Sequence, residues 1–132
     1  MTEIPAAYLD LLQEKKAFAN LATVMKDGSP QVTPVWFDYT NGHVRVNTAK
    51  GRVKARTLRE GSRVALSILD PDNPYRYLQI RGQVVSATEE GASAHIDSLA
   101  KKYLGKDKYP WSKPEDVRIM YEIKPLAAQA MG

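Results

Sequence analysis

Short apolar runs, several of them alternating with polar residues, recur along the chain and are separated by turn residues. A period of two and an abundance of β-branched and aromatic residues predict strands. We expect strands at residues 18–25, 31–39, 43–47, 63–69, 75–87 and 117–123, with a tail after Pro125. Residues 26–30 and 40–42 are turn signals, and Asn41-Gly42 favours the positive φ of a tight hairpin. These runs therefore predict hairpin-linked antiparallel strands.

Three other segments are predicted to be helical, two from the spacing of their apolar positions and one from the i, i+4, i+7 spacing of Arg52, Arg56 and Arg59. They are residues 5–14, residues 52–60 and a longer segment beginning at Thr88, which is a candidate N-cap. The apolar stripe of the last segment consists of Ala92, Ile96, Leu99, Ala100 and Tyr103. Many strands and about three helices predict a mainly β fold, an antiparallel β-barrel with helices.

Two residues predict irregular strands. Pro34 lacks the N–H group that a sheet ladder needs, so its strand lies at an edge or bulges there. Gly82 interrupts the strand at 75–87 and indicates a bulge or a close backbone contact.

The composition limits the classes of protein. With 132 residues, 43% hydrophobic and 26% charged, the sequence predicts a single globular domain, residues 1–132. No apolar run is long enough for a membrane span, and residues 1–10 do not resemble a secretory signal, so a cytoplasmic location is expected. The absence of cysteine excludes disulfides, thiolate nucleophiles and cysteine-ligated metals.

The net charge of +4 is concentrated in one segment. Residues 50–63 contain six lysines and arginines against Glu60 alone. Gly51 lies between a strand and a helix, where free amides suit a phosphate, and the neighbouring Lys50, Arg52 and Lys54 supply cationic donors. We interpret this segment as an anion cradle; a solvated basic helix face is the alternative.

Catalytic side chains are scarce. His43 and His95 have no partner at metal-ligand spacing, so no metal site is predicted, and no serine lies in a nucleophile elbow. A hydrolase is therefore poorly supported, and a bound cofactor would carry the chemistry. Aromatic residues that could bind a flat ring are Trp36, Phe37, Tyr39, Tyr75, Tyr77 and Trp111.

Three segments together resemble the split β-barrel proteins of the pyridoxamine 5′-phosphate oxidase-like superfamily, which bind flavins and deazaflavins. Residues 22–36 resemble the first hairpin of that fold, residues 47–66 its phosphate-binding turn and next strand, and residues 77–82 the strand that lines the cofactor. The resemblance covers roughly residues 8–131 and implies a homodimer with cofactor sites between subunits.

The resemblance also implies roles for individual residues. Thr48, Gly51, Arg52 and Lys54 would hold the cofactor phosphate, with extra charge from Lys50, Arg56 and Arg59. The ring would lie along Thr33, Pro34, Val35 and Trp36, while Tyr77 and Gln79 would approach it across the cleft. Trp111 and Arg118 fall where the oxidases have partner-subunit contacts.

The C-terminus lacks the arginine-rich substrate segment of the true oxidases, and the Gly51–Arg56 turn looks most like the short reductases that use the deazaflavin coenzyme F420. We therefore expect an oxidoreductase that passes hydride from reduced F420 to an electron-poor small molecule. The sequence identifies no catalytic residue for this reaction. An FMN-binding oxidoreductase or flavin-binding protein is the alternative. A nucleic-acid-binding β-barrel is less favoured, because basic and aromatic residues are not interleaved on adjacent strands.

Overall fold

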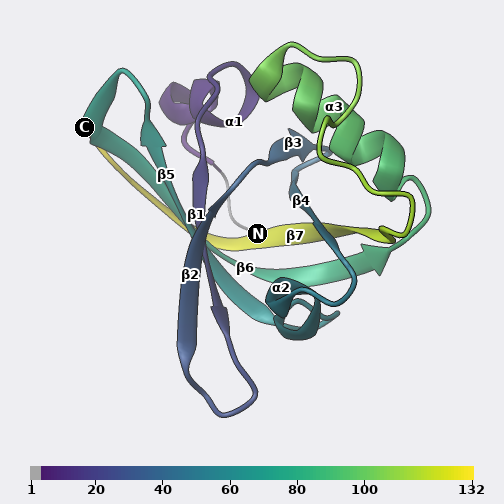
Figure 1. Ribbon diagram of the computed structural model, residues 1–132. Helices are drawn as coiled ribbons and strands as arrows, with labels where there is room; N and C mark the ends of the chain where they lie inside the picture. Colours follow the sequence, from purple (N-terminus) through teal and green to yellow (C-terminus); the bar gives the residue numbers. More distant parts are fainter. Residues whose placement is uncertain (1–3) are drawn as a thin grey trace.

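The computed structural model describes residues 4–132, and within them seven strands form one antiparallel sheet (Figure 1). The sheet order is β2-β1-β5-β6-β7-β4-β3. The strands are β1 (Ala19–Val24), β2 (Pro30–Val35), β3 (Asp38–Thr40), β4 (His43–Ala49), β5 (Arg63–Asp70), β6 (Asn73–Thr88) and β7 (Arg118–Met131). The expected mainly β, antiparallel architecture is confirmed.

The two edges of the sheet are neighbours in the sequence. β2 and β3 lie at opposite edges, yet only Trp36 and Phe37 separate them. A two-residue link can span only about 10 Å, so the sheet must curl until its edges approach each other. No ladder joins β2 to β3 within residues 4–132, and the barrel is therefore split along this line.

Within residues 4–132, four helical elements accompany the sheet: the 3₁₀ turn η1 (Ala6–Tyr8), α1 (Asp10–Gln13), α2 (Val53–Thr57) and α3 (Ala92–Leu104). The prediction of one helix over residues 5–14 was wrong, because the chain breaks between η1 and α1. The basic helix is also shorter than residues 52–60. Thr88 does not cap α3: it ends β6 and its Oγ1 accepts the Glu90 N–H at 3.1 Å, while Gly91 precedes the helix at φ 76°.

Two predicted strands differ from the observed ones. The run 31–39 is divided into β2 and β3 by the link, and β7 continues through Pro125 to Met131 where a tail was expected. Pro125 fits because it faces Gly82 at a shift in the β6–β7 register. A Cβ at position 82 would lie 2.7 Å from both the Ile123 Cγ2 and the Lys124 carbonyl oxygen. The bulge predicted at Gly82 is thus confirmed, and so is the edge position of Pro34.

The hydrophobic core fills the curled sheet and is closed at one end by α1. Leu11 and Leu12 of α1 belong to the same buried cluster as Phe37 and Tyr121. Ion pairs hold α1 against the sheet at this end. The Arg76 Nη2 lies 2.7 Å from the Asp10 Oδ1, and the Arg76 Nη1 lies 2.9 Å from the Asp70 Oδ2. In the described part of the chain, no helix is long and apolar enough to cross a membrane.

Candidate functional site

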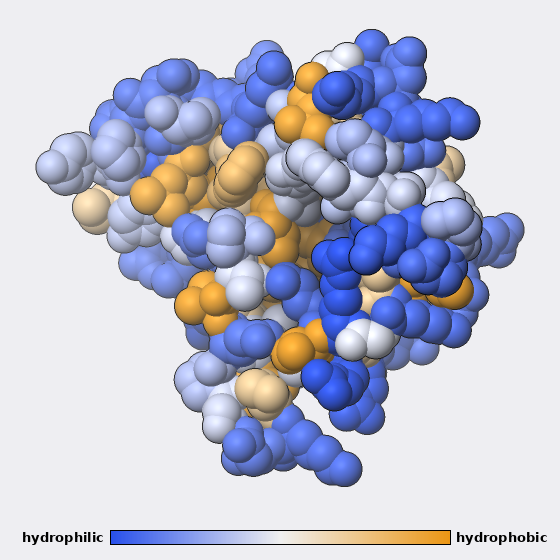
Figure 2. Space-filling model, viewed as in Figure 1, coloured by the Kyte–Doolittle hydropathy of each residue, from blue (hydrophilic) through white to orange (hydrophobic). Residues whose placement is uncertain are grey.

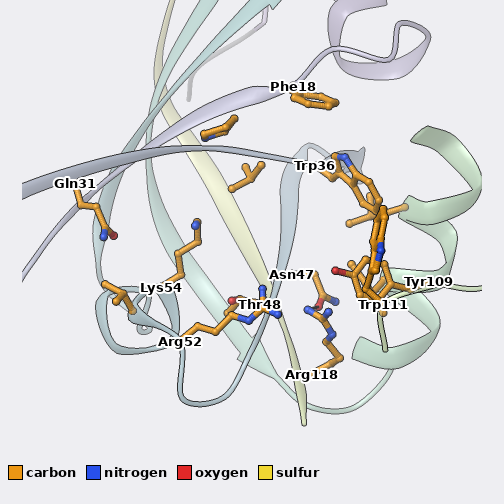
Figure 3. A pocket seen from close by; sticks show the side chains of 15 residues that line it. Phe18, Gln31, Trp36, Asn47, Thr48, Arg52, Lys54, Tyr109, Trp111 and Arg118 are labelled. Carbon is orange, nitrogen blue, oxygen red and sulfur yellow. Dashed lines mark hydrogen bonds between the residues drawn. The ribbon is translucent and has the colours of Figure 1, made fainter. Parts of the chain in front are cut away.

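A cavity of about 310 Å³ opens between β2, β4, α2, α3 and the loop that precedes β7 (Figure 3). Figure 2 shows this face hollowed, with apolar residues at the bottom of the hollow and hydrophilic residues around it. Fifteen residues line the cavity: Phe18, Gln31, Pro34, Val35, Trp36, Asn47, Thr48, Arg52, Val53, Lys54, Ile96, Leu99, Tyr109, Trp111 and Arg118.

Aromatic rings form one wall of the cavity. Trp36 is stacked on Tyr103 of α3, with ring centres 5.2 Å apart and planes inclined by 6°. Tyr109 meets Trp36 edge-on at 6.0 Å, and Trp111 continues the row at 5.5 Å from Tyr109. Trp111 lies at the rim and is 61% exposed. Such a wall suits the face of a flat conjugated ring.

Cationic side chains form the opposite side. Arg52 and Lys54 come from the turn after β4 and from α2, and Figure 3 shows Lys54 pointing into the cavity. Burial, and then the nearby Arg52, lower the pKa of Lys54. Thr48, 4% exposed, adds a hydroxyl at the end of β4. Among the described residues that line the cavity none is acidic, so this side attracts anions.

Arg118 is the third cation of the cavity and is only 6% exposed. Its Nη1 lies 3.5 Å from the Asn47 Oδ1, and its guanidinium covers the Tyr109 ring at 4.8 Å. Its Nε and Nη2 are buried and have no hydrogen-bond partner within residues 4–132. Leaving two N–H groups of a charged side chain buried and unpaired is energetically costly.

A chain of polar groups holds Asn47. The Asn47 Nδ2 donates to the Ala92 carbonyl at 2.9 Å and lies 3.0 Å from the His95 Nδ1. The other ring nitrogen of His95, Nε2, is buried and lies 3.2 Å from an Asp38 carboxylate oxygen. Burial alone would raise the pKa of Asp38, but contacts with His95 and Arg45 outweigh it and lower this pKa to about 2.

Acid should therefore weaken the fold through Asp38. The pKa of Asp38 is about 2 in the folded protein, whereas the ordinary value is 3.8. The ionised carboxylate therefore stabilises the folded state above about pH 4, and this contribution is lost as the pH falls toward 2. The shift corresponds to about 2 kcal/mol. We expect Asp38→Asn to flatten the pH dependence of urea unfolding between pH 4 and 2. Asp107→Asn, at an exposed carboxylate, should leave it unchanged, and equal slopes for all three proteins would contradict this account.

Of the residues predicted for the site, eight line the cavity together: Pro34, Val35, Trp36, Thr48, Arg52, Lys54, Trp111 and Arg118. Thr33 and Gly51 do not. Lys50 points elsewhere and pairs with Glu89 at 2.6 Å. Tyr77 and Gln79 lie on β6 outside the cavity, and the Tyr77 hydroxyl contacts the Met131 sulfur at 3.6 Å. Their expected role requires a second subunit.

Several lining residues were not predicted: Phe18, Gln31, Asn47, Val53, Ile96, Leu99 and Tyr109. Ile96 and Leu99 belong to the predicted apolar stripe of α3, and both are buried and form part of the cavity wall. Asn47 is the first residue of the basic motif and directly precedes Thr48. This position in the motif could have identified Asn47 as a site residue. Nothing local marks Tyr109, whose loop brings it beside Arg118. Within residues 4–132, no three His, Asp or Glu side chains could hold a metal ion.

Residues 4–131 match the family model described as pyridoxamine 5′-phosphate oxidase. The chain belongs to the pyridoxamine 5′-phosphate oxidase family. No curated protein matches the sequence. An F420 reductase of solved structure is 34% identical, with a TM-score of 0.82, over 96% of this chain and 98% of that one. The family and the reductase match indicate an oxidoreductase of the flavin- or deazaflavin-binding kind.

Two more distant structures share the fold of this family member. A conserved hypothetical protein from Mycobacterium tuberculosis is 22% identical, with a TM-score of 0.74 over 98% of this chain and 84% of that one. An FAD binding protein from Mycobacterium smegmatis is 16% identical, with a TM-score of 0.65 over 98% of this chain and 96% of that one.

Proposed function

We propose that the protein is an F420-dependent oxidoreductase that reduces a planar, electron-poor small molecule. The observation that carries the proposal is the pairing of an aromatic wall with a carboxylate-free cationic side in one cavity. The similarity to an F420 reductase over nearly the whole chain supports the deazaflavin over other cofactors.

The donors of the cavity suit such a cofactor. A phosphate would bind at Arg52, Lys54 and the Thr48 hydroxyl, because cations and a hydroxyl donor meet there without a competing acid. The ring would lie along Pro34, Val35 and Trp36. The edge position of β2 leaves its outer backbone groups without ladder partners in the described chain, so they can serve as hydrogen-bond partners for the ring.

The protein's contribution to the chemistry is positioning. The reduced deazaflavin, when bound, supplies the hydride. Trp36 and Tyr109 hold flat groups face to face or edge to face, and the cavity walls exclude water. Arg52, Lys54 and Arg118 give the cavity a positive potential, which stabilises negative charge that develops on an acceptor as it is reduced.

Titration of the purified protein with F420 and, separately, with FMN tests the proposal. Fluorescence should report saturable binding of F420 that is at least about tenfold tighter than binding of FMN, equivalent to about 1.4 kcal/mol. Tighter binding of FMN would place the protein among the FMN-binding oxidoreductases of the family. Binding of neither would remove the cofactor assignment.

We further infer that the functional unit is a homodimer, with Tyr77 and Gln79 reaching the partner's cofactor. Exposed apolar side chains on the outside of the sheet support this inference, namely Val24, Val32, Leu126 and Met131. Light scattering after size-exclusion chromatography should give twice the 14.7 kDa of the chain. A monomer at micromolar concentration would contradict the dimer.

A further inference from the structure

The side-chain amine of Lys54 has no partner in the described part of the chain. Its Nζ makes no hydrogen bond or ion pair within residues 4–132. The nitrogen is not sealed off either, because the buried side-chain atoms that lack a partner there belong to His95 and Arg118. Figure 3 shows the Lys54 side chain reaching from α2 into the cavity. A ligand in the cavity can therefore reach this nitrogen.

The surroundings of Lys54 favour its neutral, nucleophilic form. Burial lowers the pKa of this lysine, and the neighbouring Arg52 lowers the pKa further. Among the described residues that line the cavity, none is acidic, so no carboxylate holds the amine in its charged form. A lysine that is partly desolvated and lies next to another cation is a typical nucleophilic amine of proteins.

We propose that, in the cofactor-free protein, Lys54 binds planar aromatic aldehydes that carry an anionic group, as a reversible imine. The aldehyde's ring would lie along Trp36 and Tyr109, because an aromatic wall suits a flat conjugated ring. The anionic group would bind Arg52, which lines the same cavity. The inference needs only this cavity and is independent of which cofactor the protein binds.

The reaction needs no oxidant or reductant. The lone pair of the neutral Lys54 Nζ forms a bond to the aldehyde carbon, the carbonyl π electrons move to the oxygen, and one N–H proton passes through water to that oxygen. The hydroxyl group then leaves as water with the second N–H proton, while the nitrogen lone pair forms the C=N bond. The cations of the cavity stabilise the negative charge that develops on the oxygen in the first step.

Lys102 provides an internal comparison, because burial lowers the pKa of this lysine as well. Its ammonium, however, donates to the Phe37 carbonyl at 2.8 Å and packs on the rings of Phe37 and Tyr103, 4.5 and 4.8 Å from their centres. Lys102 does not line the cavity. If access to the cavity is what makes Lys54 reactive, Lys102 should stay unmodified.

The probe is para-formylbenzoate, with benzaldehyde as its neutral control. Sodium cyanoborohydride fixes any imine, because its hydride adds to the imine carbon as the nitrogen takes up a proton. Peptide mass mapping of the cofactor-free wild type should find the carboxybenzyl group on Lys54 at least about tenfold faster than on Lys102 or on the exposed Lys26, because the cavity holds the aldehyde beside the amine. Benzaldehyde should label Lys54 at least about tenfold more slowly than para-formylbenzoate, because it lacks the group that binds Arg52.

Two variants separate the roles of the cations. Lys54→Arg keeps the charge without the amine, so the fast phase of labelling should disappear from the intact protein. Arg52→Gln should reduce the preference for para-formylbenzoate over benzaldehyde at Lys54 to less than about twofold. Because both aldehydes react with the same amine, this preference does not depend on the pKa of Lys54.

Three results would overturn the proposal: equal labelling of Lys54, Lys102 and Lys26, equal rates with the two aldehydes, or an unchanged preference in Arg52→Gln. The first two are measured on the wild type, so the proposal stays testable if a variant fails to fold. The F420 titration is a separate experiment on the same protein. Labelled Lys54 without F420 binding would remove the proposed function alone, and tight F420 binding with unlabelled Lys54 would remove this inference alone.

Discussion

Replacing both Arg52 and Lys54 with alanine should weaken F420 binding by about 100-fold or more, since each charge-assisted hydrogen bond contributes about 1.5–3 kcal/mol. Lys54→Ala should account for the larger share, because Lys54 is half-buried in the cavity whereas Arg52 is exposed. The unfolding midpoint should hardly change, since neither side chain belongs to the core. Fluorescence titration and urea unfolding measure the two quantities.

Two cations of the same segment serve as controls. Lys50 is paired with Glu89, and Arg56 is exposed on α2 outside the cavity, so alanine at either position should change F420 affinity by less than about threefold, as expected of exposed charges. If Lys50→Ala weakens F420 binding as much as Lys54→Ala does, the cofactor phosphate binds at the Gly51 turn instead. Unchanged affinity in the double variant would remove the phosphate from this side of the cavity.

The fold could be predicted from the sequence because its signals are local. The Asn41-Gly42 turn has the expected positive φ values, 53° and 79°, and the strands follow the alternation of apolar residues. Pro34 and Gly82 marked an edge and a bulge through properties of single residues, a missing N–H and a missing Cβ. Local rules failed where a second feature intervened: Pro125 stays in β7 because the bulge at Gly82 faces it.

The candidate site was predictable only in part. Arg52, Lys54 and Thr48 are close in sequence, so one motif identifies them. Arg118 is brought beside them by the β4–β7 register, in which Ala49 faces Arg118, and no local pattern specifies that pairing. The helix expected over residues 52–60 was predicted too long, because charged residues at helical spacing do not set helix length, and α2 has only five residues.

Phe37 joins the two edges of the split sheet and is fully buried. α3 fixes its backbone: the Phe37 carbonyl accepts from the Lys102 Nζ at 2.8 Å, and its N–H donates to the Tyr103 hydroxyl at 3.3 Å. The Lys102 ammonium also lies 4.5 Å from the centre of the Phe37 ring. Removing that ring would open a cavity at the point where the barrel closes.

We therefore expect Phe37→Ala to lower the free energy of unfolding by about 3–5 kcal/mol in urea titrations. The other phenylalanine is a matched control. Phe18 is 51% exposed and meets Tyr103 only edge-on, so Phe18→Ala should cost about 1 kcal/mol or less. Because Trp36 adjoins Phe37, the first variant should also loosen the aromatic wall and weaken F420 binding. Equal losses of stability for the two variants would show that the link does not hold the barrel closed.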